Sequence, residues 1–225
     1  MLKRKQRGMS LVGVMIGLTI SLIVSMTILA LYRQSSVSSS ISKDASLKMS
    51  SVSTALLSAS NTLQKAGYFI NINNASDVAA NLVLLSNAQF DGTTLTGAVV
   101  QTPTAIGQAS VSGNALVWAW KDSAEQTTQC SGLVMIGEQM YLLQPNACTN
   151  ALDYSSISWS SYELVKKGLA TGTSIVASFN SCAIFSYGTK NNSPSIALNL
   201  AYNPVEGDSK TKTLTTNICL QNLTQ

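Results

Sequence analysis

Residues 8–31 read GMSLVGVMIGLTISLIVSMTILAL, an apolar run without a single charged residue. A basic cluster precedes it (Lys3, Arg4, Lys5 and Arg7), and the next charge along the chain is Arg33. As a helix, about 20 apolar residues cross the ~30 Å hydrocarbon layer of a bilayer. Cations flanking such a helix stay on the cytoplasmic side. The sequence therefore predicts a single-pass membrane helix whose long carboxyl-terminal portion faces outward.

The leader differs from an ordinary secretory signal. Such a signal has an apolar core of ~7–15 residues followed by a small-residue cleavage site. Here the apolar run is longer, and no Ala-x-Ala-like site follows it. Gly8 instead lies between the basic cluster and the apolar run. A cut after Gly8 removes the charges and leaves the whole membrane segment on the mature protein.

The residues around this junction resemble the class III signal of type IV pilins and pseudopilins. They are Arg7-Gly8-Met9-Ser10-Leu11-Val12, followed by Met15-Ile16-Gly17-Leu18. The resemblance implies that a prepilin peptidase cuts between Gly8 and Met9 and methylates the new amino terminus at Met9. Most family members have Phe at the position of Met9.

A second departure from the family pattern is Gly13, the fifth residue after the expected cut. The family usually has Glu at this position, where it meets the terminal amine of a neighbouring subunit in the fibre. Pseudopilins at fibre tips dispense with this Glu, because no subunit lies beyond them. Gly13 therefore favours a minor, tip-proximal subunit over a major one.

One long helix is expected from Met9 to about residue 67, because no Pro and no Gly interrupts residues 18–66. Its transmembrane half is residues 9–32. The small residues Gly13, Gly17, Ser21 and Ser25 fall four apart there, a spacing that lets another helix backbone approach closely. In the second half, apolar residues recur at steps of three and four and predict a face that packs on a globular head. They are Val37, Ile41, Ala45, Met49, Val52, Leu56, Ala59 and Leu63.

Residues 68–225 are expected to form a β-rich head, so that the fold class is α+β: a long amino-terminal helix packed on an antiparallel sheet, as in pilins. Short strand-like runs alternate with turn formers, and many Thr, Ser and Asn residues predict strands with one wet face. The expected strands are 82–85, 95–100, 116–120, a hairpin over 133–143, 174–187, 196–202 and 212–220. A short helix is expected over Ser161–Lys167, ended by Gly168.

The four cysteines, Cys130, Cys148, Cys182 and Cys219, all fall in the outward domain, where an oxidising compartment favours disulfides. Three pairings are possible. We favour Cys130–Cys148, because these two flank the 133–143 hairpin nearly symmetrically, and Cys182–Cys219 follows by elimination. Without histidine, and with unsuitable cysteine spacing, no zinc site is expected.

The net charge expected after cleavage excludes a general electrostatic attraction of the whole protein to nucleic acid. Of 14 basic residues, four lie in the leader, so cleavage leaves 10 to balance 10 acidic residues. The one adjacent basic pair downstream, Lys166-Lys167, is expected to be a solvated helix end. We therefore expect no direct nucleic-acid ligand, although local patches remain open.

Catalytic signals are weak. No histidine exists for a Ser–His or Cys–His pair, and the carboxylate pairs Asp122/Glu125 and Glu206/Asp208 lie in expected loops. A calcium site at Glu206-Gly207-Asp208 has suitable oxygen ligands but no known loop pattern. Trp118 and Trp120 share one face of a strand and are expected in the core. We expect no catalytic residues, no cofactor and no metal.

Short segments in the head narrow the resemblance to PilW-type minor pilins. They are Leu63-Gln64-Lys65-Ala66-Gly67-Tyr68, Asn114–Trp118 with Cys130-Ser131-Gly132, and Leu214–Asn222. The resemblance implies a single-pass inner-membrane protein with a cytoplasmic amino terminus and a periplasmic head, which later becomes part of a pilus on the cell surface. Its implied partners are the prepilin peptidase, the other minor pilins, the major pilin, the assembly platform and the lipid bilayer.

Three functions follow. The first is a minor pilin that initiates or caps a type IV pilus used for twitching, adhesion or DNA uptake. The second is a minor pseudopilin of type II secretion. The third is a signal-anchored binding protein or enzyme that never enters a fibre, which the Gly8 junction disfavours because a plain anchor needs no glycine there.

Overall fold

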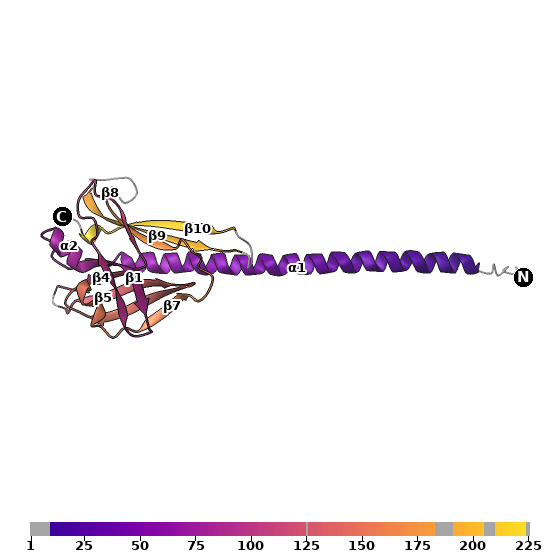
Figure 1. The fold of residues 1–225 in the computed structure, drawn as a ribbon, viewed down its shortest axis with the longest axis horizontal. Coiled ribbons are helices and arrows are strands. Elements are labelled where there is room, and N and C mark those ends of the chain that lie inside the picture. Colours follow the sequence, from indigo (N-terminus) through magenta and orange to yellow (C-terminus); the bar gives the residue numbers. More distant parts are fainter. Residues whose placement is uncertain (1–9, 125, 183–190, 205–209, 224–225) are drawn as a thin grey trace, which may run out of the picture. The chain divides into compact units, whose positions relative to one another are not determined.

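The computed structural model describes residues 10–124, 126–182, 191–204 and 210–223 (Figure 1). Its contacts divide the chain into two compact units, Met1–Ala45 and Ser46–Gln225, the second of which we call the head. The long helix α1 (Leu11–Leu63) contributes to both units. Its last third therefore belongs to the head.

Two antiparallel sheets build the rest of the head. The six-stranded sheet has the order β2-β1-β4-β5-β6-β7, and the four-stranded sheet has the order β10-β9-β8-β3. The strands of the first sheet are β1 (Leu82–Phe90), β2 (Leu95–Val100), β4 (Ala115–Trp120), β5 (Gln129–Ile136), β6 (Gln139–Ala147) and β7 (Ser161–Val165). Those of the second are β3 (Val111–Gly113), β8 (Ser174–Cys182), β9 (Asn191–Tyr202) and β10 (Lys212–Cys219). Short helices α2 (Ala75–Asn81) and η1 (Ala151–Ser155) lie in connections, and η3 (Gln221–Leu223) follows β10.

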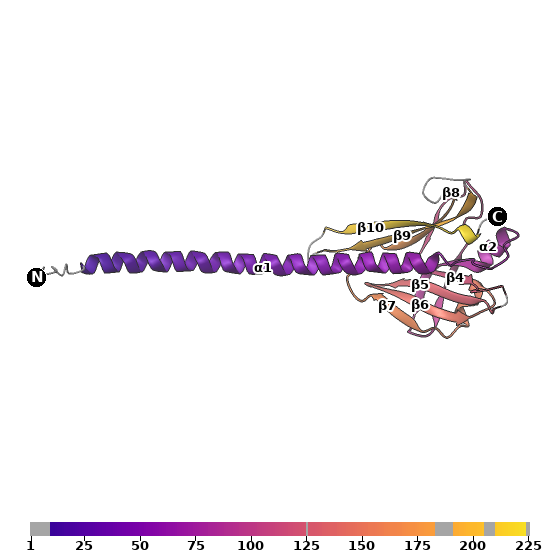
Figure 2. The same ribbon diagram turned by 180° about the vertical axis from the view of Figure 1, so that it is seen from behind.

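The carboxyl-terminal part of α1 lies between the two sheets, as both ribbon views show (Figures 1 and 2). Its buried residues are Val52, Ala55, Leu56, Ala59 and Leu63. They share one apolar cluster with residues of both sheets, among them Trp118, Leu133, Ile175, Ile196 and Ile218. The fold is therefore α+β, with one long amino-terminal helix packed against antiparallel sheets, as expected from the sequence.

A second apolar cluster covers the opposite face of the six-stranded sheet. Val83, Val117 and Val134 point into it and meet Ala151 and Trp159 from the segment that follows β6. All six residues of β4 are consequently buried. The expectation of strands with one wet face is wrong for this strand, because the 148–159 segment shields the face that would otherwise be solvated.

The amphipathic face expected along α1 is buried only from Val52 onward. Val37, Ile41 and Met49 are exposed, and Ala45 is half-buried. Helical periodicity fixes which residues share a face, but it does not say where the covering sheets end.

The expected helix at Ser161–Lys167 is wrong, because residues 161–165 form the edge strand β7. Leu142 pairs with Tyr162, and Tyr141 pairs with Glu163. A side-chain hydrogen bond from Gln139 Nε2 to Glu163 Oε1, 2.8 Å long, supports this pairing. The backbone of β6 needs partners on its outer side, and this demand outweighs the weak local preference for a helix.

The junction after α1 depends on Gly67, whose φ is +77°. Its N–H donates to the carbonyl of Ala119, 2.8 Å away. The carboxyl-terminal segment packs directly on it, so that a Cβ at this position would lie 2.5 Å from Leu223 Cδ2. Asn222 adds a hydrogen bond from Nδ2 to the carbonyl of Gln64 (3.0 Å). The last residues of the chain thus close the end of the head at which α1 ends.

Candidate functional site

The amino-terminal segment is the strongest candidate for a functional site. The expected cleavage and methylation positions, Gly8 and Met9, lie outside the described residues. The described chain starts at Ser10, whose carbonyl accepts hydrogen bonds from the N–H groups of Gly13 (2.9 Å) and Val14 (3.3 Å). The helix α1 therefore begins at Leu11, and a cut after Gly8 would leave all of it on the mature chain.

The first part of α1 presents apolar side chains outward over its whole circumference. The large apolar residues from Leu11 to Leu31 are 45–77% exposed, whereas those of the core are at most 8% exposed. By length and composition, this helix is able to cross a membrane. Since exposed apolar area costs roughly 25 cal/mol per Å² in water, this surface calls for lipid or for other helices around it.

Most hydroxyl groups in this segment are satisfied within the helix. Thr19 donates to the carbonyl of Ile16 (2.9 Å), Ser25 to that of Ser21 (2.8 Å) and Thr27 to that of Val24 (2.8 Å). Hydroxyl groups that bond back to their own helix add little polarity to its surface. The segment is therefore compatible with hydrocarbon despite its Ser and Thr residues.

The four small residues leave open space beside the helix. No heavy atom comes within 4 Å of a Cβ built at Gly13 or Gly17, and Ser21 and Ser25 are exposed. With one small residue every fourth position, another helix is able to approach the backbone closely. Among the described residues of the first unit, 10–45, nothing occupies this space, so the use of Gly13, Gly17, Ser21 and Ser25 in helix packing stays a prediction.

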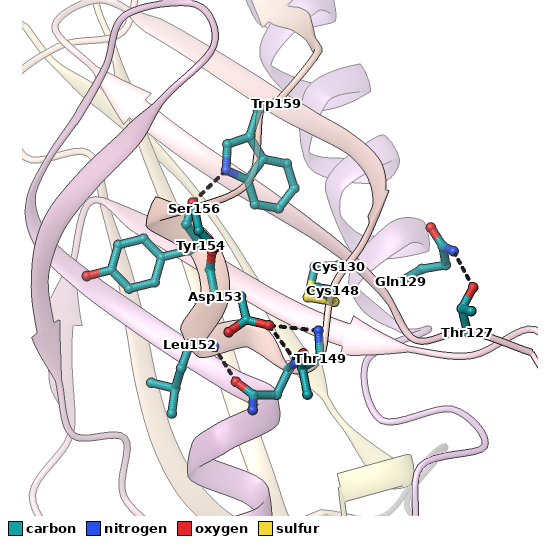
Figure 3. The surroundings of a disulfide bond; sticks show 11 residues. Thr127, Gln129, Cys130, Cys148, Thr149, Leu152, Asp153, Tyr154, Ser156 and Trp159 are labelled. Carbon is teal, nitrogen blue, oxygen red and sulfur yellow. Dashed lines mark hydrogen bonds between the residues drawn. A yellow bond between two sulfur atoms is a disulfide. The ribbon is translucent and has the colours of Figure 1, made fainter.

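The head contains the disulfide Cys130–Cys148, which joins the start of β5 to the residue that follows β6 (Figure 3). Cys130 is fully buried in the second apolar cluster, and the N–H of Cys148 donates to the carbonyl of Thr128 (3.1 Å). The bond closes a loop with a sequence separation of 18, for which chain entropy gives about 3 kcal/mol of stabilisation.

The segment after Cys148 is held by a dense set of hydrogen bonds. Asp153 accepts from the N–H of Thr149 (2.7 Å), and Trp159 Nε1 donates to the carbonyl of Tyr154 (2.9 Å) (Figure 3). The bond from Thr149 is the main cause of the lowered pKa of Asp153. The disulfide thus anchors the segment that covers the outer face of the six-stranded sheet.

The second pair of cysteines is only partly described. Cys219 is disulfide-bonded, but the side chain of Cys182 lies outside the described residues. The pairing Cys182–Cys219 therefore stays a prediction.

The tryptophans expected in the core are buried there. Trp118 and Trp120 both join the cluster around α1, and Lys65 Nζ lies 5.9 Å from the centre of the Trp120 ring. Neither is available as a stacking platform for a ligand.

The remaining polar candidates of the head are described only in part. Within the described ranges, no three His, Cys, Asp or Glu side chains come close enough to hold a metal ion. Glu125, Glu206 and Asp208 lie outside these ranges, and so does the calcium site considered from the sequence. Lys166 and Lys167 are exposed and follow the end of β7, so they end a strand and not a helix.

Comparison with known proteins supports the interpretation of the amino-terminal segment. Residues 3–31 match the family described as Prokaryotic N-terminal methylation motif. Neither a curated protein nor a solved structure matches the chain. The match includes Gly8 and Met9, together with the whole exposed apolar run. With the α+β fold, this prepilin-type motif supports a membrane-anchored, structural protein of the type IV pilin-like kind.

Proposed function

We propose that the protein is a minor pilin that helps to initiate a type IV pilus and lies at or near its tip. The observation that carries this proposal is the prepilin-type motif at residues 3–31, continued by a helix whose apolar surface has no cover within its own unit. A subunit built to leave the membrane and enter a fibre requires both features.

Processing comes first in the proposed mechanism. The basic leader holds the precursor in the inner membrane with the head in the periplasm. Prepilin peptidase then cuts between Gly8 and Met9 and methylates Met9. This step removes four positive charges next to the helix and frees it for lateral packing along Gly13, Gly17, Ser21 and Ser25.

The position near the tip is supported by Gly13. A carboxylate in hydrocarbon is costly unless a positive charge pairs with it, so a subunit that carries one gains from a neighbour with a free terminal amine. Gly13 removes both the cost and the reason for such a neighbour. A subunit with nothing beyond it needs no carboxylate at this position.

The head supplies the contacts to partners in this proposal. Its disulfide and its filled core make it a rigid body outside the membrane. We infer that its surface pairs with other minor pilins and with the major pilin, while the helix contacts the bilayer and the assembly platform.

Maturation is tested first with the protein from its own membranes, by intact mass and amino-terminal sequencing. We expect a chain that starts at N-methylated Met9. In a Gly8→Leu variant we expect the full-length precursor and loss of surface pili, because the peptidase needs the small residue before the cut. Gly13→Leu is the matched control, since it changes a glycine beyond the cut and should still be processed. Normal pili on Gly8→Leu cells would contradict the processing step.

Deleting the gene separates the pilus from the secretion machine. Loss of surface pili supports the proposal, whereas exoproteins retained in the periplasm with normal pili indicate a pseudopilin of type II secretion. Crosslinking tests the tip position separately. A protein crosslinked along the shaft, with pilins on both sides, would remove the argument from Gly13.

A further inference from the structure

Strand β10 forms an open edge of the four-stranded sheet, whose order is β10-β9-β8-β3 (Figure 1). It pairs with β9 over eight residues without a register shift, from Lys212 with Tyr202 to Cys219 with Ser195. The strand contains neither proline nor glycine. A long and regular edge of this kind is a template on which another chain can add a strand.

The other edges of the two sheets carry features that hinder such an addition. β3 has only three residues. β2 shifts its register against β1, and its Gly97 carbonyl already accepts a hydrogen bond from Tyr154 Oη (3.0 Å). β7 has five residues, shifts its register against β6 and carries the charge of Glu163 in its middle. Proteins protect sheet edges by shortness, bulges and charge, and β10 has none of these beyond the lysine at its first residue.

The direction of the backbone groups of β10 follows from its neighbour β9. The N–H of Ala201 donates to Thr173 Oγ1 (3.1 Å), and its carbonyl accepts from the N–H of Ala170 (2.7 Å). Both groups of Ala201 therefore point away from β10. Two opposed residues of an antiparallel pair either exchange hydrogen bonds or both turn their groups outward. Thr213 lies opposite Ala201, so its N–H and its carbonyl point to the open edge.

The same alternation turns the backbone groups of Thr215 and Asn217 to the open edge. Among the described residues, these groups and those of Thr213 have no hydrogen-bond partner. On the face toward α1, Ile218 belongs to the buried apolar cluster and Leu214 packs against it. The edge thus offers a donor and an acceptor at every second residue, beside an apolar inner face.

Charge indicates which strand the edge fits. Lys212 is exposed and forms no ion pair with another described residue. In an antiparallel pair, the residue opposite Lys212 lies near the carboxyl end of the added strand. A carboxylate at that position is favourable, because opposite charges across a pair of strands attract. A second copy of β10 does not meet this requirement, since β10 contains no carboxylate.

We propose that β10 docks an extended segment of a different pilus subunit, which adds to the sheet as an antiparallel strand. The segment has an apolar residue opposite Leu214 and a carboxylate opposite Lys212. Its backbone bonds set the register, and its side chains supply most of the affinity, because the backbone groups exchange hydrogen bonds with water for hydrogen bonds with the head. This inference rests on the proposed function and deepens it, since it assigns the surface of the head that meets another subunit.

Binding is tested on the full-length protein in a zwitterionic detergent. The probe is a short synthetic peptide in which valine and threonine alternate and aspartate comes last, and the control peptide ends in lysine instead. With the first peptide at millimolar concentration, hydrogen exchange at the N–H groups of Thr213, Thr215 and Asn217 should slow at least about tenfold. The control peptide should need an about threefold higher concentration for the same effect. No protection of β10, or equal protection by both peptides, would overturn the proposal.

Two substitutions of Thr215 separate the backbone from the side chain. Both Thr215→Pro and Thr215→Val lose the hydrogen bond from Thr215 Oγ1 to Asn199 Oδ1 (2.9 Å), but only proline removes the outward N–H. The proline variant should bind the peptide at least about tenfold more weakly than the valine variant. If the proline variant does not fold, Lys212→Glu replaces it and should reverse the preference between the two peptides. Equal binding by the proline and valine variants, or an unchanged preference of Lys212→Glu, would contradict docking at β10.

Crosslinking in cells distinguishes failure of this inference from failure of the proposed function. A photoreactive p-benzoylphenylalanine in place of Thr215 should form an adduct with a different subunit that carries a prepilin-type motif. The same group in place of Tyr162, an exposed residue of β7, should not. In cells whose pili depend on the gene, no adduct from position 215, or an adduct with a second copy, would overturn docking at β10 and leave the pilus role intact. Normal pili after deletion of the gene would instead contradict the proposed function.

Discussion

A glycine can be required for two reasons, a positive φ and close contact with another segment. Gly67 has both, and comparison with Gly107 separates their contributions to stability. Gly67 and Gly107 have similar positive φ values, +77° and +88°, but only Gly67 touches another segment. Gly107→Ala should cost about 1 kcal/mol, because a left-handed backbone disfavours any Cβ. Gly67→Ala should cost a further ~1–3 kcal/mol, because its Cβ would overlap Leu223 and Asn222. Urea unfolding of both variants measures the difference, and equal losses would contradict the contact with the carboxyl terminus.

A second prediction at this scale concerns pH. Asp91 accepts hydrogen bonds from the N–H groups of Thr94 (2.7 Å) and Thr93 (2.9 Å), and from both of their hydroxyls. These bonds, that from the N–H of Thr94 above all, hold the pKa of Asp91 well below its usual range. The lowered pKa means that Asp91 stabilises the fold fully above the unfolded-state pKa of about 3.9, and progressively less as the pH falls below that value.

The Asp91→Asn variant tests this reasoning, because it keeps one oxygen acceptor and removes the titration. Its deficit in stability relative to the native chain should be constant above about pH 4 and should shrink in more acidic solution. Unfolding curves recorded across that range give the deficit. A deficit that grows on acidification would mean that the pKa of Asp91 is raised in the folded state.

At the scale of elements, the buried face of α1 predicts where substitutions are harmful. Leu63 is fully buried between the sheets, whereas Leu57 is 66% exposed on the same helix. Leu63→Ala should lower the free energy of unfolding by about 2–5 kcal/mol through the cavity that it leaves. Leu57→Ala should change it by less than about 0.5 kcal/mol. Chemical denaturation of the two variants compares them directly, and similar losses would show that α1 does not pack in the head through this face.

Several elements could be predicted from sequence because their signals are local. Turn formers at both ends delimit β2, and the hairpin of β5 and β6 turns at Gly137, whose φ is +58°. The prepilin-type motif is the clearest case, since it lies within one continuous stretch of chain, residues 3–31. It needs no tertiary structure to be recognised.

The elements that escaped prediction depend on distant partners. Strand β7 forms because β6 offers an unpaired edge, and the seven-residue helix α2 is started by Asn74, whose side chain accepts from the N–H of Asp77 (3.0 Å). The segment of residues 101–110 passes from β2 of the six-stranded sheet to β3 of the four-stranded sheet. No pattern within ten or fifteen neighbouring residues indicates such a crossing.

For the whole molecule, the distribution of exposed apolar residues predicts solution behaviour. The buried part of α1 begins at Val52. The continuous exposed apolar surface of the helix lies within Leu11–Leu31. A fragment that starts at Ser46 should remain monomeric in aqueous buffer, while the full chain should need detergent, because water tolerates little contiguous apolar area. Analytical ultracentrifugation measures both. Aggregation of a folded fragment would show that the head, too, has apolar surface that a partner must cover.

The closure of the head by residues 196–223 has a consequence for the order of events while the chain is synthesised and folds. The apolar face of α1 from Val52 to Leu63 is synthesised early, yet part of its cover consists of Ile196, Ile218, Leu220 and Leu223. Contacts between residues so far apart in sequence form slowly, because a long loop must close first. This face of α1 therefore stays partly exposed until residues 196–223 have been synthesised and have packed on it. During this interval a chaperone would have its best opportunity to bind the chain, and an incomplete chain would be most exposed to proteases.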